Sequence, residues 1–172
     1  DSHLRRPEAA TWLARLLPEQ DNLRAALQWA LDEERYEDAA WLMVAIHYFW
    51  YLSGHRFEGA RWLARLLPHR HLLANDLRLA TLICFHMFES EESQALDRYS
   101  GEILQLTESS AEPFLQVAAW YFLALQASDV SQAAAGLERA LAAARTTNEA
   151  PGPNAEFSAM GDRGFALPGV LG

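Results

Sequence analysis

Apolar residues recur at steps of three and four along nearly the whole chain, which is the spacing of one face of an α-helix. Alanine and leucine dominate these stretches, and both favour helix. Turn-forming residues interrupt the pattern at regular intervals, and almost nothing alternates as a strand does. We therefore expect an all-α fold with about eight helices. The expected helices span residues 8–17, 19–33, 36–53, 56–67, 75–89, 92–108, 112–127 and 129–146.

Three of the expected helix ends have a physical cause. Pro18 cannot continue the first helix but suits the opening of the second. Gly54 follows the long apolar helix, where a left-handed cap is expected. Asp129 is expected to be the N-cap of the last helix.

Short turns between these helices predict helical hairpins that stack side by side. Ala60, Ala95 and Ala133 lie 35 and 38 residues apart, each about one turn into the second helix of an expected hairpin. A small residue there lets two helices approach closely. We therefore expect a helix–turn–helix unit that repeats every 34–40 residues.

This pattern divides the chain into one folded domain and a tail. The domain spans 1–146, with an N-terminal helical pair over 8–35 and three hairpins over 36–146. Proline and glycine interrupt the pattern after it, so 147–172 is expected to be irregular, the alternative being a truncated further repeat. The chain does not begin with Met, which predicts a fragment of a longer protein.

The segment WLARLLP occurs twice, at Trp12–Pro18 and at Trp62–Pro68. Different residues follow the two copies, so we do not expect them to be successive repeats. Each is expected to be a short helix with a Trp/Leu face that ends at proline. A real pseudo-symmetry between the copies is the alternative.

Composition and charge narrow the function. The chain has 172 residues, a net charge of −9 and fourteen cations, all of them arginine, which disfavours nucleic-acid binding. Cys84 is the single cysteine, so no disulfide framework forms and a reducing, cytoplasmic location is expected. The longest apolar run, Ala40–Leu52, falls short of the ~20 residues that a membrane span needs. No membrane contact is expected.

The segment SDVSQAAAGLERALAAA, over Ser128–Ala144, resembles the second-helix half of a tetratricopeptide repeat. Ala133 and Ala140 match the small positions of that repeat, and Leu137 matches the large one. The resemblance implies a right-handed superhelix of helical hairpins.

A longer resemblance covers Glu8 to about Leu82 and involves the helical C-terminal region of bacterial STAND-type regulators, the LuxR-type and antibiotic-regulatory ATPases. In such proteins this region follows a nucleotide-binding module and a winged helix, and it is taken to sense an inducer or partner and to restrain the ATPase. The residues that carry the resemblance are Trp12-Leu13, Asp21–Leu27, Trp29, Phe49-Trp50, Gly54-His55 and Glu58–Leu63.

The tetratricopeptide resemblance implies that the first helix of each hairpin lines a concave apolar groove. Helical steps of three and four then define a stripe along 36–53, 75–89 and 112–127. We call the eight residues expected to contact a partner the predicted groove residues. They are Trp41, Tyr48, Tyr51, Cys84, Met87, Phe88, Phe122 and Gln126.

The opposite stripe of the same helices is apolar as well, so something is expected to cover the groove. The candidates are a protein or peptide partner, other domains of the parent chain, or a second copy that forms a homodimer. Alternatively, the array curls tightly and fills its own groove, with the N-terminal hairpin or the Pro/Gly tail lying across it.

Catalytic and metal-binding motifs are missing from the sequence. GxxxxGK[ST], GxSxG and HExxH do not occur. His86 and Glu89 with nearby Cys84, and the turn residues His69 and His71, fall short of the three or four converging ligands that zinc needs. We expect no enzyme activity, metal or cofactor. The sequence predicts an interaction or sensor module of a larger signal-transduction ATPase or transcriptional regulator, the alternative being a self-associating helical-repeat scaffold.

Overall fold

The computed structural model describes residues 9–88 and 95–146, with side chains from residue 10 in the first range and from 98 in the second. Every regular element in these ranges is helical, which confirms the all-α prediction. No helix in them is long and apolar enough to cross a membrane. The α-helices are α1 (Ala9–Leu16), α2 (Gln20–Asp32), α3 (Tyr36–Leu52), α4 (Arg56–Leu66), α5 (Asn75–Phe88), α6 (Ala95–Ser109), α7 (Pro113–Gln126) and α8 (Val130–Thr146), and the 3-10 segments are η2 (Leu17–Glu19) and η3 (Leu67–Leu72).

The three predicted helix ends are confirmed. Pro18 lies in η2, where α1 gives way to α2. Gly54 has a φ of +79°, a left-handed conformation that glycine adopts without strain. The Oδ1 atom of Asp129 accepts a hydrogen bond from the backbone N–H of Ser131 at 2.8 Å, as an N-cap does.

The two WLARLLP segments share their local structure but not their surroundings. Each forms the end of an α-helix that passes into a 3-10 segment at Leu-Pro. In each, an arginine lies over the tryptophan of the same turn at 5.0 Å, Arg15 over Trp12 and Arg65 over Trp62. The leucines of the second copy are buried, whereas Leu13 and Leu16 of the first copy are only partly buried. The seven shared residues therefore determine the local backbone structure, and the neighbouring helices determine how deeply the leucines are buried.

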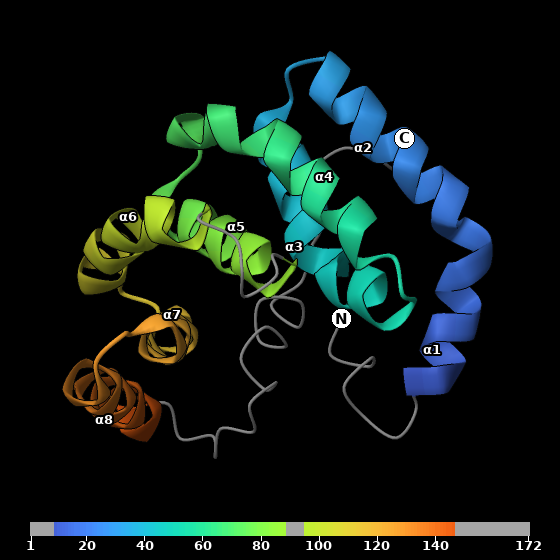
Figure 1. Cartoon of the computed structure of the whole chain (residues 1–172). Coiled ribbons are helices and arrows are strands. Elements are labelled where there is room, and N and C mark those ends of the chain that lie inside the picture. The colour runs from blue at the N-terminus through green and yellow to red at the C-terminus, as the bar shows by residue number, and fades with distance from the viewer. Residues whose placement is uncertain (1–8, 89–94, 147–172) are drawn as a thin grey trace.

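The helices follow an arc from α1 to α8, with α3, α5 and α7 on its inner side (Figure 1). From α2 onward, each helix packs against the next along the chain. In addition, α3 packs on both α1 and α5, and α5 packs on α7. Alternate helices therefore form a continuous layer, which α4, α6 and α8 flank.

The layer of α3, α5 and α7 repeats one buried position. Ala40, Ala80 and Ala118 each have 0 % of their surface exposed, and they are 40 and 38 residues apart. A methyl side chain at a fully buried point allows the backbones of packed helices to come close. A fully buried alanine therefore recurs every 38–40 residues in α3, α5 and α7.

The flanking helices repeat a second set of buried positions with a spacing that the sequence analysis missed. Leu63, Ile103 and Ala140 are buried at steps of 40 and 37 residues, and each is followed by buried residues three and four positions later. Ala60 and Ala133, expected to make the close contacts, are only partly buried, and the side chain of Ala95 lies outside the described residues. The buried positions of these helices therefore lie at other residues than Ala60 and Ala133.

Two glycines lie where one helix passes close to the next. A Cβ atom added to Gly59 of α4 would lie 2.9 Å from the ring of Phe88 on α5. A Cβ atom added to Gly136 of α8 would lie 2.9 Å from the Cβ of Ala124 on α7. Both distances are shorter than real Cβ contacts, so a larger residue at either position forces a shift in its neighbour.

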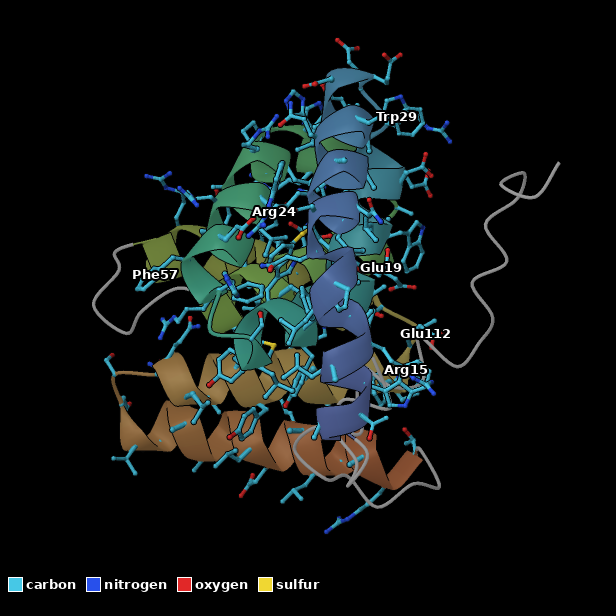
Figure 2. The ribbon with its side chains drawn as sticks, turned by 90° about the vertical axis from the view of Figure 1, so that its right-hand side faces the viewer. Arg15, Glu19, Arg24, Trp29, Phe57 and Glu112 are labelled. Atoms are coloured by element: carbon cyan, nitrogen blue, oxygen red, sulfur yellow. The ribbon has the colours of Figure 1, made fainter. Side chains whose placement is uncertain are left out.

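Charged side chains join neighbouring helices. The Nε and Nη2 atoms of Arg24 on α2 donate to the two carboxylate oxygens of Glu58 on α4 at 2.6 and 2.7 Å. Figure 2 shows Arg24 between these two helices. Further along, Glu102 of α6 accepts hydrogen bonds from Arg70 of η3, at 2.9 Å, and from Arg78 of α5. Both carboxylates are largely buried, which strengthens the pairs.

Candidate functional site

The predicted groove residues lie on the continuous layer of α3, α5 and α7, and six of the eight are accessible to some degree. Tyr51, at the end of α3, is the most exposed of them, with 49 % of its surface accessible. Five are partly buried, and four of these pack one side against the main hydrophobic core. The five are Trp41, Tyr48, Met87, Phe122 and Gln126, of which all but Gln126 belong to the core-packed group.

Cys84 and Phe88 are buried in the core, with 0 % and 1 % of their surfaces exposed. Helix α5 packs against α3, α4, α6 and α7, so nearly all of its circumference is covered. The ring of Phe88 lies over Gly59 of α4 rather than facing the inner side of the arc. These two residues stabilise the array and offer no surface to a partner. The apolar character of Cys84 and Phe88 does not by itself distinguish a core residue from a residue that contacts a partner.

The aromatic side chains of α3 form a connected group. The rings of Tyr48 and Tyr51 are 6.2 Å apart, and the ring of His47 meets Tyr48 edge-on at 5.4 Å. His47 is fully buried and its Nδ1–H donates to the carbonyl oxygen of Val44 at 2.6 Å. The backbone carbonyl therefore holds the ring of His47 in place, and this buried ring packs against the ring of Tyr48.

Gln126 links three helices rather than pointing freely toward a partner. Its side-chain N–H donates to the Nδ1 atom of His86 on α5 at 3.1 Å. The hydroxyl of Ser100 on α6 donates to the Oε1 atom of Gln126 at 3.4 Å. The glutamine therefore fixes the C-terminal end of α7 against α5 and α6.

Side chains of the kinds that bind metals lie apart from one another in the described part of the chain. There, no three His, Cys, Asp or Glu side chains converge as metal ligands would. His69, expected to be a solvated turn residue, instead stacks on Tyr36 with ring centroids 4.0 Å apart and planes 6° from parallel. Glu89, which follows His86 by one helical turn in the sequence, lies outside the described residues.

A cleft of about 520 Å³ lies between α6, α7 and α8, and the sequence analysis did not find it. Of the predicted groove residues only Gln126 lines it. Its lining combines apolar and polar side chains with a single charged one, Arg139. The available signal was a glycine inside each flanking helix, Gly101 and Gly136, because helix interiors rarely carry glycine without a reason.

A smaller depression of about 230 Å³ on α4 is lined by Glu58, Arg61, Trp62 and Arg65. The hydrogen bonds from Arg24 lower the pKa of Glu58 below its ordinary value. The same pairing raises the pKa of Arg24. Both groups are therefore charged across the physiological range and neutralise each other, which is the behaviour of a structural ion pair rather than of an acid or base in catalysis.

Comparison of the chain with protein-family models, with curated proteins and with solved structures finds no match. The likeness to tetratricopeptide arrays and to STAND-type regulators therefore stays a prediction based on the residues quoted above. The function has to be argued from the geometry of the described helices.

Proposed function

We propose that the chain is a tetratricopeptide-like array, a right-handed superhelix of helical hairpins. The packing order supports this architecture, because α1, α3, α5 and α7 follow one another in one layer while α4, α6 and α8 flank it. The recurrence of fully buried alanine in α3, α5 and α7 supports it as well. Each hairpin then contacts only its neighbours, as in other helical-repeat proteins.

The function that this geometry supports best is a non-catalytic interaction or sensor module of a larger signal-transduction ATPase or transcriptional regulator. One observation carries the proposal: Tyr48, Met87 and Phe122, from three successive first helices, each pack on the core and remain partly accessible. Aromatic and methionine side chains in this position suit adaptable contact with an apolar partner. The partner is a peptide or helix, from another protein or from the parent chain itself.

Selection of peptides that bind the purified chain tests the proposal directly. A display library of amphipathic peptides is panned against the wild-type chain, and the affinity of each selected peptide is measured by calorimetry. Tyr48→Ala and Met87→Ala are expected to lower the affinity for the selected peptides by about tenfold or more, since a buried anchor at an interface contributes ~2 kcal/mol. Helicity by circular dichroism is expected to stay at the wild-type level.

Phe57→Ala is the matched control, because Phe57 is 72 % exposed and projects at the side of the molecule from α4 (Figure 2). It removes an aromatic ring of the same class without touching the proposed surface, so affinity is expected to be unchanged. If Tyr48→Ala and Met87→Ala instead unfold cooperatively at a much lower temperature, these side chains belong to a closed interior and the proposal is wrong.

Two further measurements separate the related hypotheses. The intact reading frame is expected to encode a phosphate-binding loop upstream, and a gene without one contradicts the regulator assignment. Sedimentation velocity over a range of concentrations is expected to show a monomer. A mass that doubles with concentration, and no longer does so in Tyr48→Ala, replaces the partner hypothesis with a self-associating scaffold.

A further inference from the structure

The cleft between α6, α7 and α8 shares only Gln126 with the predicted groove residues. Within the described residues, Glu108 of α6 and Arg139 of α8 form an ion pair at 3.9 Å. Both side chains are more than half exposed, at 60 % and 56 %, so the pair is weak and Arg139 can exchange this partner for another anion.

Gly101 has no packing reason to be glycine. It lies inside α6, where glycine is the least favourable residue except proline. A Cβ atom added there would meet nothing within 4 Å, in contrast to Gly136 across the cleft, where it would collide with Ala124. Because residue 101 is glycine, the wall of the cleft has open space next to the backbone of α6. Glycine at such a wall is typical of places where a ligand approaches the backbone closely.

The remaining lining defines which ligand chemistry fits. The guanidinium of Arg139 lies over the ring of Trp120 at 4.5 Å, which holds it at the rim of the cleft. It is the only charged side chain among the lining residues. Leu104 and Leu123 supply an apolar wall, and the hydroxyl of Ser100 adds a polar group. The volume lies within the range of about 300–1,000 Å³ found for small-molecule sites.

We propose that this cleft binds a small organic monoanion, a carboxylate carried on an apolar body. The carboxylate accepts hydrogen bonds from the planar fork of Arg139, which presents paired donors to a carboxylate. The apolar body lies along Leu104 and Leu123 and reaches the backbone at Gly101. The chain as a whole carries −9, so the single arginine supplies the local selectivity for an anion over a neutral analogue.

Calorimetric titration of the whole chain tests this proposal, with octanoate and phenylacetate as probes and octanamide and phenylacetamide as neutral controls of the same shape. At least one acid is expected to bind, and its amide to bind about tenfold more weakly or not at all, because the amide lacks the charge-assisted hydrogen bonds. Heteronuclear NMR is expected to show shifts at Gly101, Trp120 and Arg139. If neither acid binds at millimolar concentration, or an acid and its amide bind equally, the proposal is overturned.

Two variants locate the site. Arg139→Gln is expected to weaken acid binding by about tenfold or more, whereas Arg145→Gln, which removes the same charge from an exposed position outside the cleft on the same helix, leaves it unchanged. Gly101→Leu fills the open space and is expected to abolish binding while the melting temperature is kept or raised. Wild-type binding in Gly101→Leu or in Arg139→Gln overturns the assignment. Tyr48→Ala, which disrupts the proposed partner surface, is expected to bind the acid normally, so the two proposals fail independently.

Discussion

At the scale of single residues, the smallest side chains decide how closely the helices approach. Gly59 and Gly136 lie where a methyl group would come within 2.9 Å of a neighbouring helix. Ala40, Ala80 and Ala118 are fully buried in the three helices that pack on one another. Gly101 is the exception among the described glycines inside helices, since a Cβ atom added there would meet nothing within 4 Å. Residue type alone therefore does not reveal which small residue is structural.

Replacement of Gly101 and Gly136 by alanine is expected to have opposite effects. Gly101→Ala gains helix propensity at no steric cost, so the free energy of unfolding rises by about 0.5–1 kcal/mol. Gly136→Ala forces α8 away from Ala124 and the carbonyl of Trp120, so the free energy of unfolding falls by about 1–3 kcal/mol. Urea denaturation followed by circular dichroism measures both. Equal changes of the same sign would show that α8 does not pack on α7 as described.

At the scale of helices, an ion pair between α2 and α4 connects the N-terminal pair to the first hairpin. Glu58 is 15 % exposed and Arg24 is 36 % exposed, so the pair is partly protected from solvent. Hydrogen bonds from Arg24 hold the pKa of Glu58 below its ordinary value of 4.5. A carboxyl group whose folded-state pKa is lowered stabilises the fold fully above its unfolded-state pKa and loses this effect as the pH falls through the folded-state value.

Glu58→Gln is therefore expected to reduce stability by about 1–2 kcal/mol at neutral pH, with the exposure of Arg24 limiting the effect. The deficit relative to wild type is expected to shrink as the pH falls from about 4.5 through the lower folded-state pKa of Glu58, because the ion pair is lost once wild-type Glu58 is protonated in the folded state. Asp21→Asn is the matched control, since Asp21 also contacts Arg24 but is 91 % exposed. A deficit that does not change with pH would contradict the charge-based account.

The turn between α3 and α4 depends on the left-handed conformation of Gly54, with φ at +79°. Gly54→Ala is expected to lower the free energy of unfolding by about 1–2 kcal/mol, because an L-residue is strained in this conformation. Nothing lies within 4 Å of the added Cβ, so the loss comes from the backbone and not from a clash. Thermal unfolding measures it. Gly54→Asn, which tolerates this conformation better, is expected to lose less, and an equal loss in both variants would point to another cause.

At the scale of the whole molecule, the helices differ in how much apolar surface they bury. Helix α4 buries Leu63 and Leu66, whereas α8 buries Ala140, Ala143 and Ala144 at matching positions. Leucine side chains contribute more to burial than alanine side chains do. The C-terminal end of the array therefore rests on less hydrophobic stabilisation than the middle.

Native-state hydrogen exchange is expected to show this difference. Amides of α8 should open with a free energy lower by about 2 kcal/mol or more than those of α4 and α5, since each buried leucine adds roughly this amount over alanine. Mass spectrometry or NMR resolves the helices separately. Uniform protection of α4, α5 and α8 would show that the array opens as one cooperative unit.

The sequence anticipated the helices well and the site only in part. Periodicity, Pro18, Gly54 and Asp129 act through local geometry, so they located helices and helix ends close to where the structure has them. Tyr48 and Cys84 lie on the same predicted stripe, yet one is partly accessible and the other is buried. The difference is one of packing and not of residue type, since ten of the fourteen residues of α5 are buried but only seven of the seventeen residues of α3.

By itself, the sequence determined the all-helical class, the positions of the turns between helices and the absence of familiar catalytic motifs, because each depends on residues close together in the chain. The tertiary structure alone decided which helix positions are fully buried, among them Ala40, Ala80 and Ala118, and formed the cleft beside Gly101 and Arg139. Both depend on how far apart packed helices lie, a distance set by side chains that are up to 40 residues apart in the chain.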